Sequence, residues 1–297
     1  MHYPNVSPAV FLARPNRFVA EVLLDSVPTT VHVKNTGRCR ELLVPGAAVW
    51  LTKSGNPNRK TAYDLIAVQK GDRLINLDAQ APNQVFFEWA STGHFLPDLT
   101  LLKPEQKHGD SRFDFYWETA ARRGFVEVKG VTLEQDNAVY FPDAPTERGV
   151  KHLHGLAAAQ AEGYDCTVCF VIQMAQADFF APNETTHPAF GQALREAAQA
   201  GVRVLAYCCD VAPDRLEMGQ AVAVRLNVGG EVVSHPLPLR DHPSNPSGFD
   251  GLHLSLRPND PDLLRQRHDD PDPDDAKRDE LVHVQRLPKV NETHQEL

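Results

Sequence analysis

Residues 111–133, SRFDFYWETAARRGFVEVKGVTL, contain two apolar segments separated by the polar turn TAARR. The segments SRFDFYWE and GFVEVKGVTL are rich in aromatic and β-branched residues, which favour strands. Because a short polar turn joins them, we expect two adjacent strands of one sheet. Asp114, Glu127 and Lys129 interrupt this apolar pattern.

These three residues predict a site for a divalent cation. Glu127 and Lys129 are two positions apart, so on a strand they project from the same face, and Asp114 comes from the neighbouring strand. Two carboxylates provide the hard oxygen ligands that Mg²⁺ or Mn²⁺ prefers. Such a metal polarises a scissile phosphate and activates water, while Lys129 positions that water or stabilises negative charge. The alternative is a structural Glu–Lys ion pair at a sheet edge, with an Asp at a strand start.

The segments around this pair predict an α/β layered domain over residues 81–240. A helix is expected at 84–91, a second over 147–163 and a third at 188–200, with apolar strands at 166–175 and 202–211. The order helix, three strands, helix, strand, helix, strand predicts a buried central sheet between helices.

This order, with an Asp and an ExK on consecutive strands, is similar to the PD-(D/E)XK nuclease core. In that resemblance Asp114, Glu127 and Lys129 are the catalytic residues. Glu88, on the preceding helix, resembles the extra acidic residue that some such nucleases add to the metal shell. A solvated helix charge is the alternative for Glu88.

Residues 1–80 predict a small β domain. Short apolar segments, AVFLA, RFVAEVLL, TTVHV, AAVWLT and YDLIAVQ, alternate with turns rich in Gly, Pro and Asn. Five short strands without a helical period predict a small barrel, and the five-stranded oligonucleotide-binding (OB) barrel is one candidate.

Basic residues near the ends of these loops predict phosphate contacts. In residues 1–80 they are Arg14, Arg17, Lys34, Arg38, Arg40, Arg59 and Lys60. At the start of the 147–163 helix, Arg148, Lys151 and His152 are expected to position a nucleic-acid strand beside the metal, because a helix start offers free N–H groups to phosphate. The nearby rings of Phe18 and Trp50 are expected in the core.

Charge is distributed unevenly along the chain. The net charge of the 297 residues is -9, yet residues 1–80 carry ten Lys and Arg against six Asp and Glu. A basic segment attracts phosphate locally, whatever the whole-chain sum. Residues 241–297 are acidic and proline-rich, which predicts a flexible tail. This tail competes with nucleic acid for the basic segment, or it is simply solvated.

Composition also excludes several classes. No run of about 18 apolar residues and no basic start leading into an apolar stretch is present, so we expect no membrane partner and a cytoplasmic protein. The cysteines are odd in number, which argues against a disulfide framework; they are Cys39, Cys166, Cys169, Cys208 and Cys209. We expect buried small apolar side chains, with zinc binding by the CxxC at 166–169 as the alternative.

Seven stretches in consistent order resemble the sugar fermentation stimulation protein A (SfsA) family, between about residues 8 and 215. They are ARPNRF, HVKNTGRCRELLVPGAAVWL, NPNRKTAYDL, GDSRFDFYW, VEVKGVTL, FPDAPTERGVKHL and EAAQAGVRVLAY. The resemblance implies an OB-type barrel, a PD-(D/E)XK nuclease-like domain, DNA binding and a link to sugar utilisation. It matches Asp114, Glu127 and Lys129 to nuclease-like positions and Glu105 to an acidic residue before the first strand.

The leading hypothesis is a DNA-binding protein with a Mg²⁺- or Mn²⁺-dependent nuclease site. The alternative is a non-enzymatic DNA-binding transcriptional regulator of sugar utilisation, of the maltose type, that keeps the nuclease-like scaffold only to grip DNA. A third class is an RNA-processing or repair factor acting within a complex. The sequence leaves open DNA against RNA, and whether the chain forms a homodimer.

Overall fold

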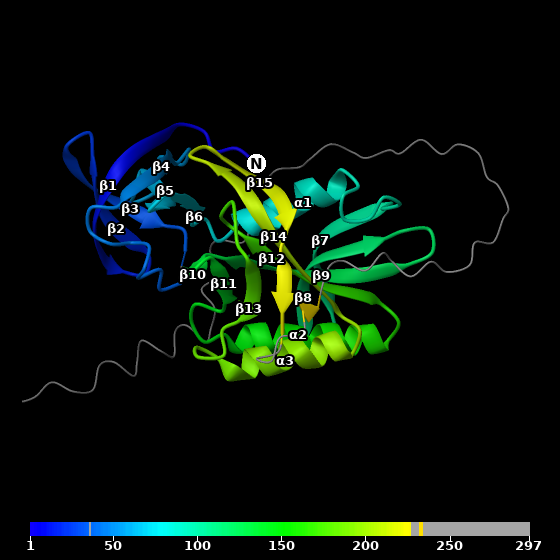
Figure 1. The fold of residues 1–297 in the computed structure, drawn as a ribbon. Helices are drawn as coiled ribbons and strands as arrows, with labels where there is room; N and C mark the ends of the chain where they lie inside the picture. Colours follow the sequence, from blue (N-terminus) through cyan, green and yellow to red (C-terminus); the bar gives the residue numbers. More distant parts are fainter. Residues whose placement is uncertain (36, 227–231, 234–297) are drawn as a thin grey trace, which may run out of the picture. The chain divides into compact units, whose positions relative to one another are not determined.

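We describe the protein from a computed structural model, which describes residues 1–35, 37–226 and 232–233. The acidic tail predicted over 241–297 lies outside the described residues. Within these residues, three sheets and three helices are arranged as shown in Figure 1. The predicted boundaries after residues 80 and 240 stay predictions.

The N-terminal strands close into a barrel. Its strands are β1 (Val6–Asn16), β2 (Val19–Leu24), β3 (Val27–Val33), β4 (Ala48–Lys53) and β5 (Tyr63–Lys70). β1 pairs antiparallel with both β2 and β4, and parallel pairing of β3 with β5 completes the ring β1–β2–β3–β5–β4. Alternate residues such as Phe11 and Val22 fill the interior, as the period of two requires. The predicted five-stranded OB-type barrel is confirmed.

A second, six-stranded sheet forms the centre of the α/β part. Its order is β15 (Arg215–Ala221), β14 (Arg203–Ala212), β12 (Asp165–Ile172), β9 (Arg123–Val131), β8 (Ser111–Glu118) and β7 (Leu101–His108). β9, β12 and β14 run parallel, whereas β7, β8 and β9 form an antiparallel meander. The central strand β12 is almost continuously apolar because both of its faces are covered.

Helices cover the two faces of this sheet, as Figure 1 shows. α1 (Ala81–Ser91) packs Phe86 against Phe115 and Val126 on one face. α2 (Glu147–Ala161) and α3 (Pro188–Gln199) pack on the other face, with Leu153 among the buried residues there. The predicted α/β layered domain is therefore confirmed.

Local signals explain how α2 begins. The Thr146 side chain accepts a hydrogen bond from the Gly149 backbone N–H at 3.1 Å. A threonine at this position satisfies one of the otherwise unpaired donors of the first helical turn. The structure therefore assigns the cap of α2 to Thr146.

Several strands were not predicted. They are β6 (Arg73–Asn76), β7, β10 (Leu133–Gln135), β11 (Ala138–Phe141), β13 (Phe179–Pro182), β15, β16 (Ala223–Arg225) and β17 (Val232–Val233). β7, LLKPEQKH, escapes detection because it is an edge strand, where charges and a proline are tolerated. Glu105 has a positive φ of 56°, and the pairing of β7 with β8 skips this position without a change of register.

Two side-chain environments differ from expectation. Phe18 is 46% exposed rather than in the core, and Trp50 is half-buried. Phe18 lies outside the core because it occupies the turn between β1 and β2, where no second layer of described residues covers it. All five cysteines are free and buried, and burial raises the pKa of Cys169 to about 12, as expected for small apolar side chains rather than ligands.

Within the described ranges, no helix has both the length and the apolar character needed to cross a bilayer. The expectation of a cytoplasmic protein stays a prediction.

Candidate active site

Glu127 is the centre of a buried polar group on β9. Its side chain is only 2% exposed, and its Oε1 atom accepts a hydrogen bond from Lys129 Nζ at 2.5 Å. The same oxygen also contacts Nδ1 of His152, on α2. The structure therefore brings Glu127 and Lys129 together, as their spacing of two on one strand predicts.

The protonation of His152 follows from its neighbours. An ionised Glu127 carboxylate only accepts hydrogen bonds, so we assign the proton to His152 Nδ1. Arg148 Nε lies 3.4 Å from His152 Nε2 and donates to it, which is consistent with an unprotonated Nε2. A chain of contacts thus runs from the exposed Arg148 through His152 to Glu127.

The second oxygen of Glu127 is different. Glu127 Oε2 is buried and has no hydrogen-bond partner among the described residues. A buried, unpaired carboxylate oxygen costs free energy, of the order of several kcal/mol for a charged group. Such an atom calls for an explanation, and an ordered water or a bound cation satisfies it.

Asp114 occupies the point where β8 and β9 separate. The pairing of these strands ends at Phe115 and Val126, and Asp114 Oδ2 accepts the Val128 backbone N–H at 2.8 Å. Its Oδ1 accepts a hydrogen bond from Asn83, at the start of α1, at 2.8 Å. The side chain of Asp114 is thereby fixed against the backbone immediately after Glu127.

Electrostatics keep Glu127 ionised. Burial alone raises the pKa of Glu127, but the Lys129 charge and the contacts of His152 and Lys129 outweigh it and lower the pKa to about 2. The carboxylate is therefore charged at neutral pH.

Glu88 is placed elsewhere. Its Oε2 pairs with the Met1 ammonium at 2.7 Å, and its Oε1 accepts from Gln84 at 3.0 Å. The physical reason is helix geometry: Asn83 is the α1 residue that contacts Asp114, and a residue five positions later points about 140° away. Of the predicted metal ligands, Glu88 is thus not brought to Asp114 and Glu127 in the described contacts.

Glu105 also differs from its expected place. It lies inside β7 rather than before the first strand of the meander, and its carboxylate pairs with Arg112 at 3.2 Å. No cluster of three or more His, Cys, Asp or Glu side chains suited to a metal ion is found in the described part of the chain.

His152 was predicted to touch nucleic acid and is instead buried against Glu127. The sequence carries only part of this signal: His152 lies four residues before Leu156, so the two share the buried face of α2, but the sequence does not indicate the partner. A polar residue on an apolar helix face needs a buried partner, and Glu127 is that partner.

Apart from Arg17 and the buried His152, the predicted phosphate-binding residues fall into two groups. Three are held by internal contacts: Arg14 by backbone carbonyls, Lys34 by Asp78 at 2.6 Å, and Arg59 by Asp64. The other group is exposed on the surface and consists of Arg38, Arg40, Lys60, Arg148 and Lys151. Arg17 is half-buried, with its guanidinium 4.8 Å from the Phe18 ring centroid.

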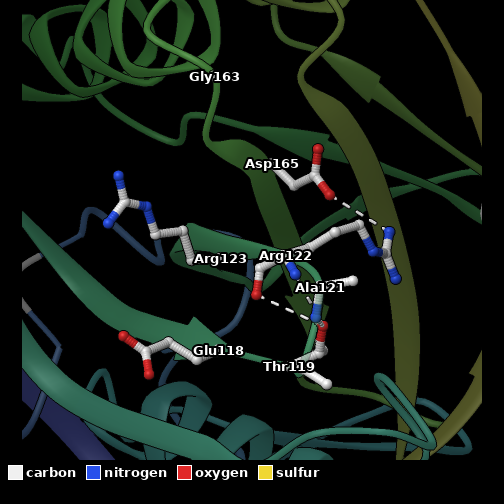
Figure 2. A pocket seen from close by; sticks show the side chains of 8 residues that line it. Glu118, Thr119, Ala121, Arg122, Arg123, Gly163 and Asp165 are labelled. Atoms are coloured by element: carbon white, nitrogen blue, oxygen red, sulfur yellow. Dashed lines mark hydrogen bonds and ion pairs between the residues drawn. The ribbon is translucent and has the colours of Figure 1, made fainter.

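A pocket of about 340 Å³ lies away from this site, at the other end of β9 (Figure 2). It is lined by Glu118, Thr119, Ala120, Ala121, Arg122, Arg123, Gly163 and Asp165. Arg122 pairs across it with Asp165 at 3.2 Å, as the dashed line in Figure 2 shows. None of the candidate catalytic residues lines this pocket.

Fold and site together define a two-part protein, an OB-type barrel followed by an α/β domain with a carboxylate–lysine group on its central sheet. Residues 12–77 match the family model described as "SfsA N-terminal OB domain". Residues 80–215 match the one described as "Sugar fermentation stimulation protein RE domain". The chain belongs to the SfsA family.

Curated relatives and a solved structure agree. The chain is 53% identical over 229 residues to a sugar fermentation stimulation protein homolog of Desulfitobacterium hafniense (strain Y51), covering 77% of this chain and all of the relative. It is 51% identical over 226 residues to the homolog of Ruminiclostridium cellulolyticum, covering 76% of this chain and 100% of that one. The structure of Pyrococcus furiosus SfsA in complex with Ca²⁺ is 26% identical, with a TM-score of 0.68, covering 76% of this chain and 98% of that chain.

Proposed function

We propose that this chain binds DNA and hydrolyses its phosphodiester bonds in a reaction that depends on Mg²⁺ or Mn²⁺. The observation that carries the proposal is the buried Oε2 atom of Glu127, which no described residue pairs, beside a carboxylate oxygen that already contacts Lys129 and His152. A purely structural ion pair would be expected to satisfy both oxygens of a buried glutamate.

The donor set fits a hard divalent cation. Glu127 Oε2 and the Asp114 carboxylate would hold it, and two carboxylates with the remaining positions left to water and phosphate are typical of Mg²⁺ sites. The Ca²⁺ complex of the Pyrococcus furiosus relative supports the idea that this fold accepts a divalent ion. When bound, the cation would polarise the scissile phosphate and lower the pKa of a water molecule.

The chain's own residues have separate tasks in this proposal. The Lys129 ammonium group would lie beside the scissile phosphate, where its positive charge stabilises the negative charge that develops as the phosphate is attacked. His152 acts as a positioning residue, because it holds Glu127 Oε1 and so directs Oε2. Asn83 holds Asp114 in the same way.

Binding would come from the exposed cations around the site. Arg148 and Lys151 are on the first turns of α2, close in sequence to His152. Neutralised phosphates release counterions, so DNA binding should weaken as salt rises.

The test is cleavage of single-stranded, duplex and branched DNA, and of RNA, with Mg²⁺, Mn²⁺ or EDTA. Wild type is compared with Glu127→Gln, Lys129→Met and the control Glu134→Gln. Glu134 is also a buried glutamate paired with a lysine, Lys70, but both of its oxygens have partners. We expect metal-dependent cleavage by the wild type and by Glu134→Gln only; absence of cleavage with every metal and substrate would overturn the proposal.

A second function is favoured by the contacts of Asp114. Both of its carboxylate oxygens already accept hydrogen bonds, from Asn83 and from Val128. If Asp114 serves only to make these hydrogen bonds, the chain is a DNA-binding regulator that keeps the nuclease-like fold but does not hydrolyse DNA. The names of the curated relatives, which refer to sugar fermentation stimulation, support a link of that regulator to sugar utilisation. Metal-independent DNA binding without cleavage would favour this function.

A further inference from the structure

An aromatic ring is held at the surface of the barrel by a rigid turn. Phe18 is 46% exposed. Its backbone N–H donates to Asn16 Oδ1 at 2.9 Å, and its carbonyl oxygen accepts from the Val33 N–H at 2.7 Å. The Arg17 guanidinium lies 4.8 Å from the ring centroid. Both the position of the ring and a cation beside it are therefore fixed by the local structure.

Arg14 ties this turn to the loop that follows β3. Its guanidinium donates to four carbonyl oxygens, those of Arg17, Asn35, Gly37 and Arg38, at 2.6–2.9 Å. An arginine that donates to so many carbonyls is committed to structure and has little left for phosphate. Its effect is to hold the exposed Arg38 next to the turn that carries Phe18.

The same loop is tied to the α/β part. The Cys39 N–H donates to Asp143 Oδ2 at 3.1 Å. The approach is close, because a Cβ atom on Gly37 would lie 3.0 Å from that carboxylate oxygen. Asp143 stands three residues before Thr146, the cap of α2, and α2 carries Lys151 and His152. Described contacts, together with the short segment from Asp143 to α2, thus connect Phe18 to Glu127.

Isolated exposed apolar side chains are common on proteins and need no explanation. Phe18 differs in its surroundings: a fixed backbone, a guanidinium on the ring, and two further exposed cations, Arg38 and Arg40, on the loop that Arg14 clamps to it. Rings with adjacent cations suit a nucleic-acid strand, because every base has a π-face and every nucleotide a phosphate. Bases of a duplex are already stacked on their neighbours, so only an unpaired base is free to stack on the ring.

We propose that Phe18 is the stacking platform of a single-strand subsite, in which Arg38 and Arg40 contact the phosphates of a DNA or RNA strand that continues toward Lys151 and Glu127. The inference rests on the proposed function only for its ligand, nucleic acid. It adds a strand preference and a residue that the charge pattern alone does not indicate.

The test measures binding of the full chain to a fluorescent single-stranded oligonucleotide, to its duplex and to an RNA strand of the same sequence, all in EDTA to prevent cleavage. We expect Phe18→Ala to weaken single-strand binding about ten-fold, DNA and RNA alike. Duplex affinity and the salt dependence should change little, since no charge is removed. Phe18→Trp should restore binding, because it restores a ring.

Val27→Ala is the matched control, since Val27 is also an exposed apolar residue at a barrel turn, 60% exposed. It should bind every probe as the wild type does. Equal affinities of wild type and Phe18→Ala for the single strand would overturn the inference, as would an equal loss for single strand and duplex.

Failure of the subsite and failure of the nuclease proposal are distinguishable. Metal-dependent cleavage with no effect of Phe18→Ala on binding removes the subsite and keeps the nuclease. Single-strand binding that depends on Phe18, in a chain that cleaves nothing, keeps the subsite and removes the nuclease.

Discussion

The barrel and the α/β part each bury a carboxylate between a histidine and a basic residue. The two carboxylates differ in whether their second oxygen has a hydrogen-bond partner among the described residues. In the barrel, Asp64 accepts from His32 and Arg59 through Oδ1 and from Arg59 again through Oδ2, at 2.6–2.9 Å. In the α/β part, Glu127 uses only Oε1 for Lys129 and His152, and no residue that the structure describes pairs with Oε2.

Under the proposed function, this difference separates a structural from a functional carboxylate. Asp64 joins the closing strands of the barrel, since His32 on β3 pairs with it on β5. All of its acceptor capacity serves the fold. Glu127 retains an oxygen that the described residues leave unpaired and that contributes nothing to stability, and residues of this kind are found where function is selected at the expense of stability.

The largest expected effect is on chemistry. Glu127→Gln should lower metal-dependent cleavage by about 10³-fold, because it removes the charge that would hold the cation. Its free energy of unfolding, measured by urea denaturation, should also fall because Lys129 loses its ionic partner, so cleavage is compared per folded molecule. Cleavage by Glu127→Gln at the wild-type rate would contradict the distinction between the two groups.

The converse is expected in the barrel. Asp64→Asn leaves Arg59 without its ionic partner and should lower the free energy of unfolding by about 3 kcal/mol. The cleavage rate per folded molecule should be that of the wild type. A selective loss of cleavage in folded Asp64→Asn protein would show that the barrel carboxylate is also functional.

The positioning role of His152 is the next test. His152→Ala should lower cleavage by about 10- to 100-fold and raise the metal concentration needed for half-maximal activity. His152→Asn keeps a donor near the Nδ1 position and should recover part of the loss. The matching His32→Ala in the barrel should affect urea denaturation but leave the metal requirement unchanged.

Low pH should reveal the contribution of Asp64 to the stability of the protein. Burial raises the pKa of Asp64, but His32 and Arg59 outweigh it and hold the pKa well below its usual range. Because the pKa is lower in the folded state, this contribution is complete above the unfolded value of about 3.9 and is lost as pH falls toward the folded value, at about 1.4 kcal/mol per pH unit. The free energy of unfolding, measured by urea denaturation at about pH 5 and about pH 3, should therefore fall more for the wild type than for Asp64→Asn. Parallel losses would show that Asp64 titrates normally.

The smallest effects concern the surface. Lys60→Ala on the barrel and Lys151→Ala on α2 should each weaken DNA binding by only a few-fold and lower the slope of log K against log salt by about 0.9 for each phosphate that is no longer neutralised. A change for Lys151 alone would confine the DNA surface to the α/β part. Exposed Lys53 provides the control charge removal.

Local pattern explains why much of the fold was predictable. The alternation in residues 9–69 specified the barrel strands, and the period of two placed Glu127 beside Lys129. The helical spacing of Leu153 and Leu156, with Thr146 before them, specified α2. These features depend on residues within one or two turns of each other, where backbone geometry alone decides which side chains meet.

The residues that were misplaced depend on contacts between distant segments. Arg14 is of a residue type that binds phosphate, but the folded loop after β3 supplies backbone carbonyls that accept its hydrogen bonds. Glu88 has the chemistry of a metal ligand, but the rotation of α1 presents Asn83 to Asp114 instead. Phe18 has the composition of a core residue, and it stays exposed only because no described segment forms a covering layer over its turn.

The sequence by itself therefore determined the five barrel strands, the apolar strands β8, β9, β12 and β14, the three helices, the family and the pairing of Glu127 with Lys129, because each follows from short-range periodicity or ordered motifs. Only the tertiary structure decided that His152 belongs to the site and that Glu127 Oε2 has no partner in the described residues. It also decided which Arg and Lys side chains are held by contacts within the protein. The physical reason is that hydrogen bonding in a protein interior is settled by all the segments that converge on a point, and no segment contains that information alone.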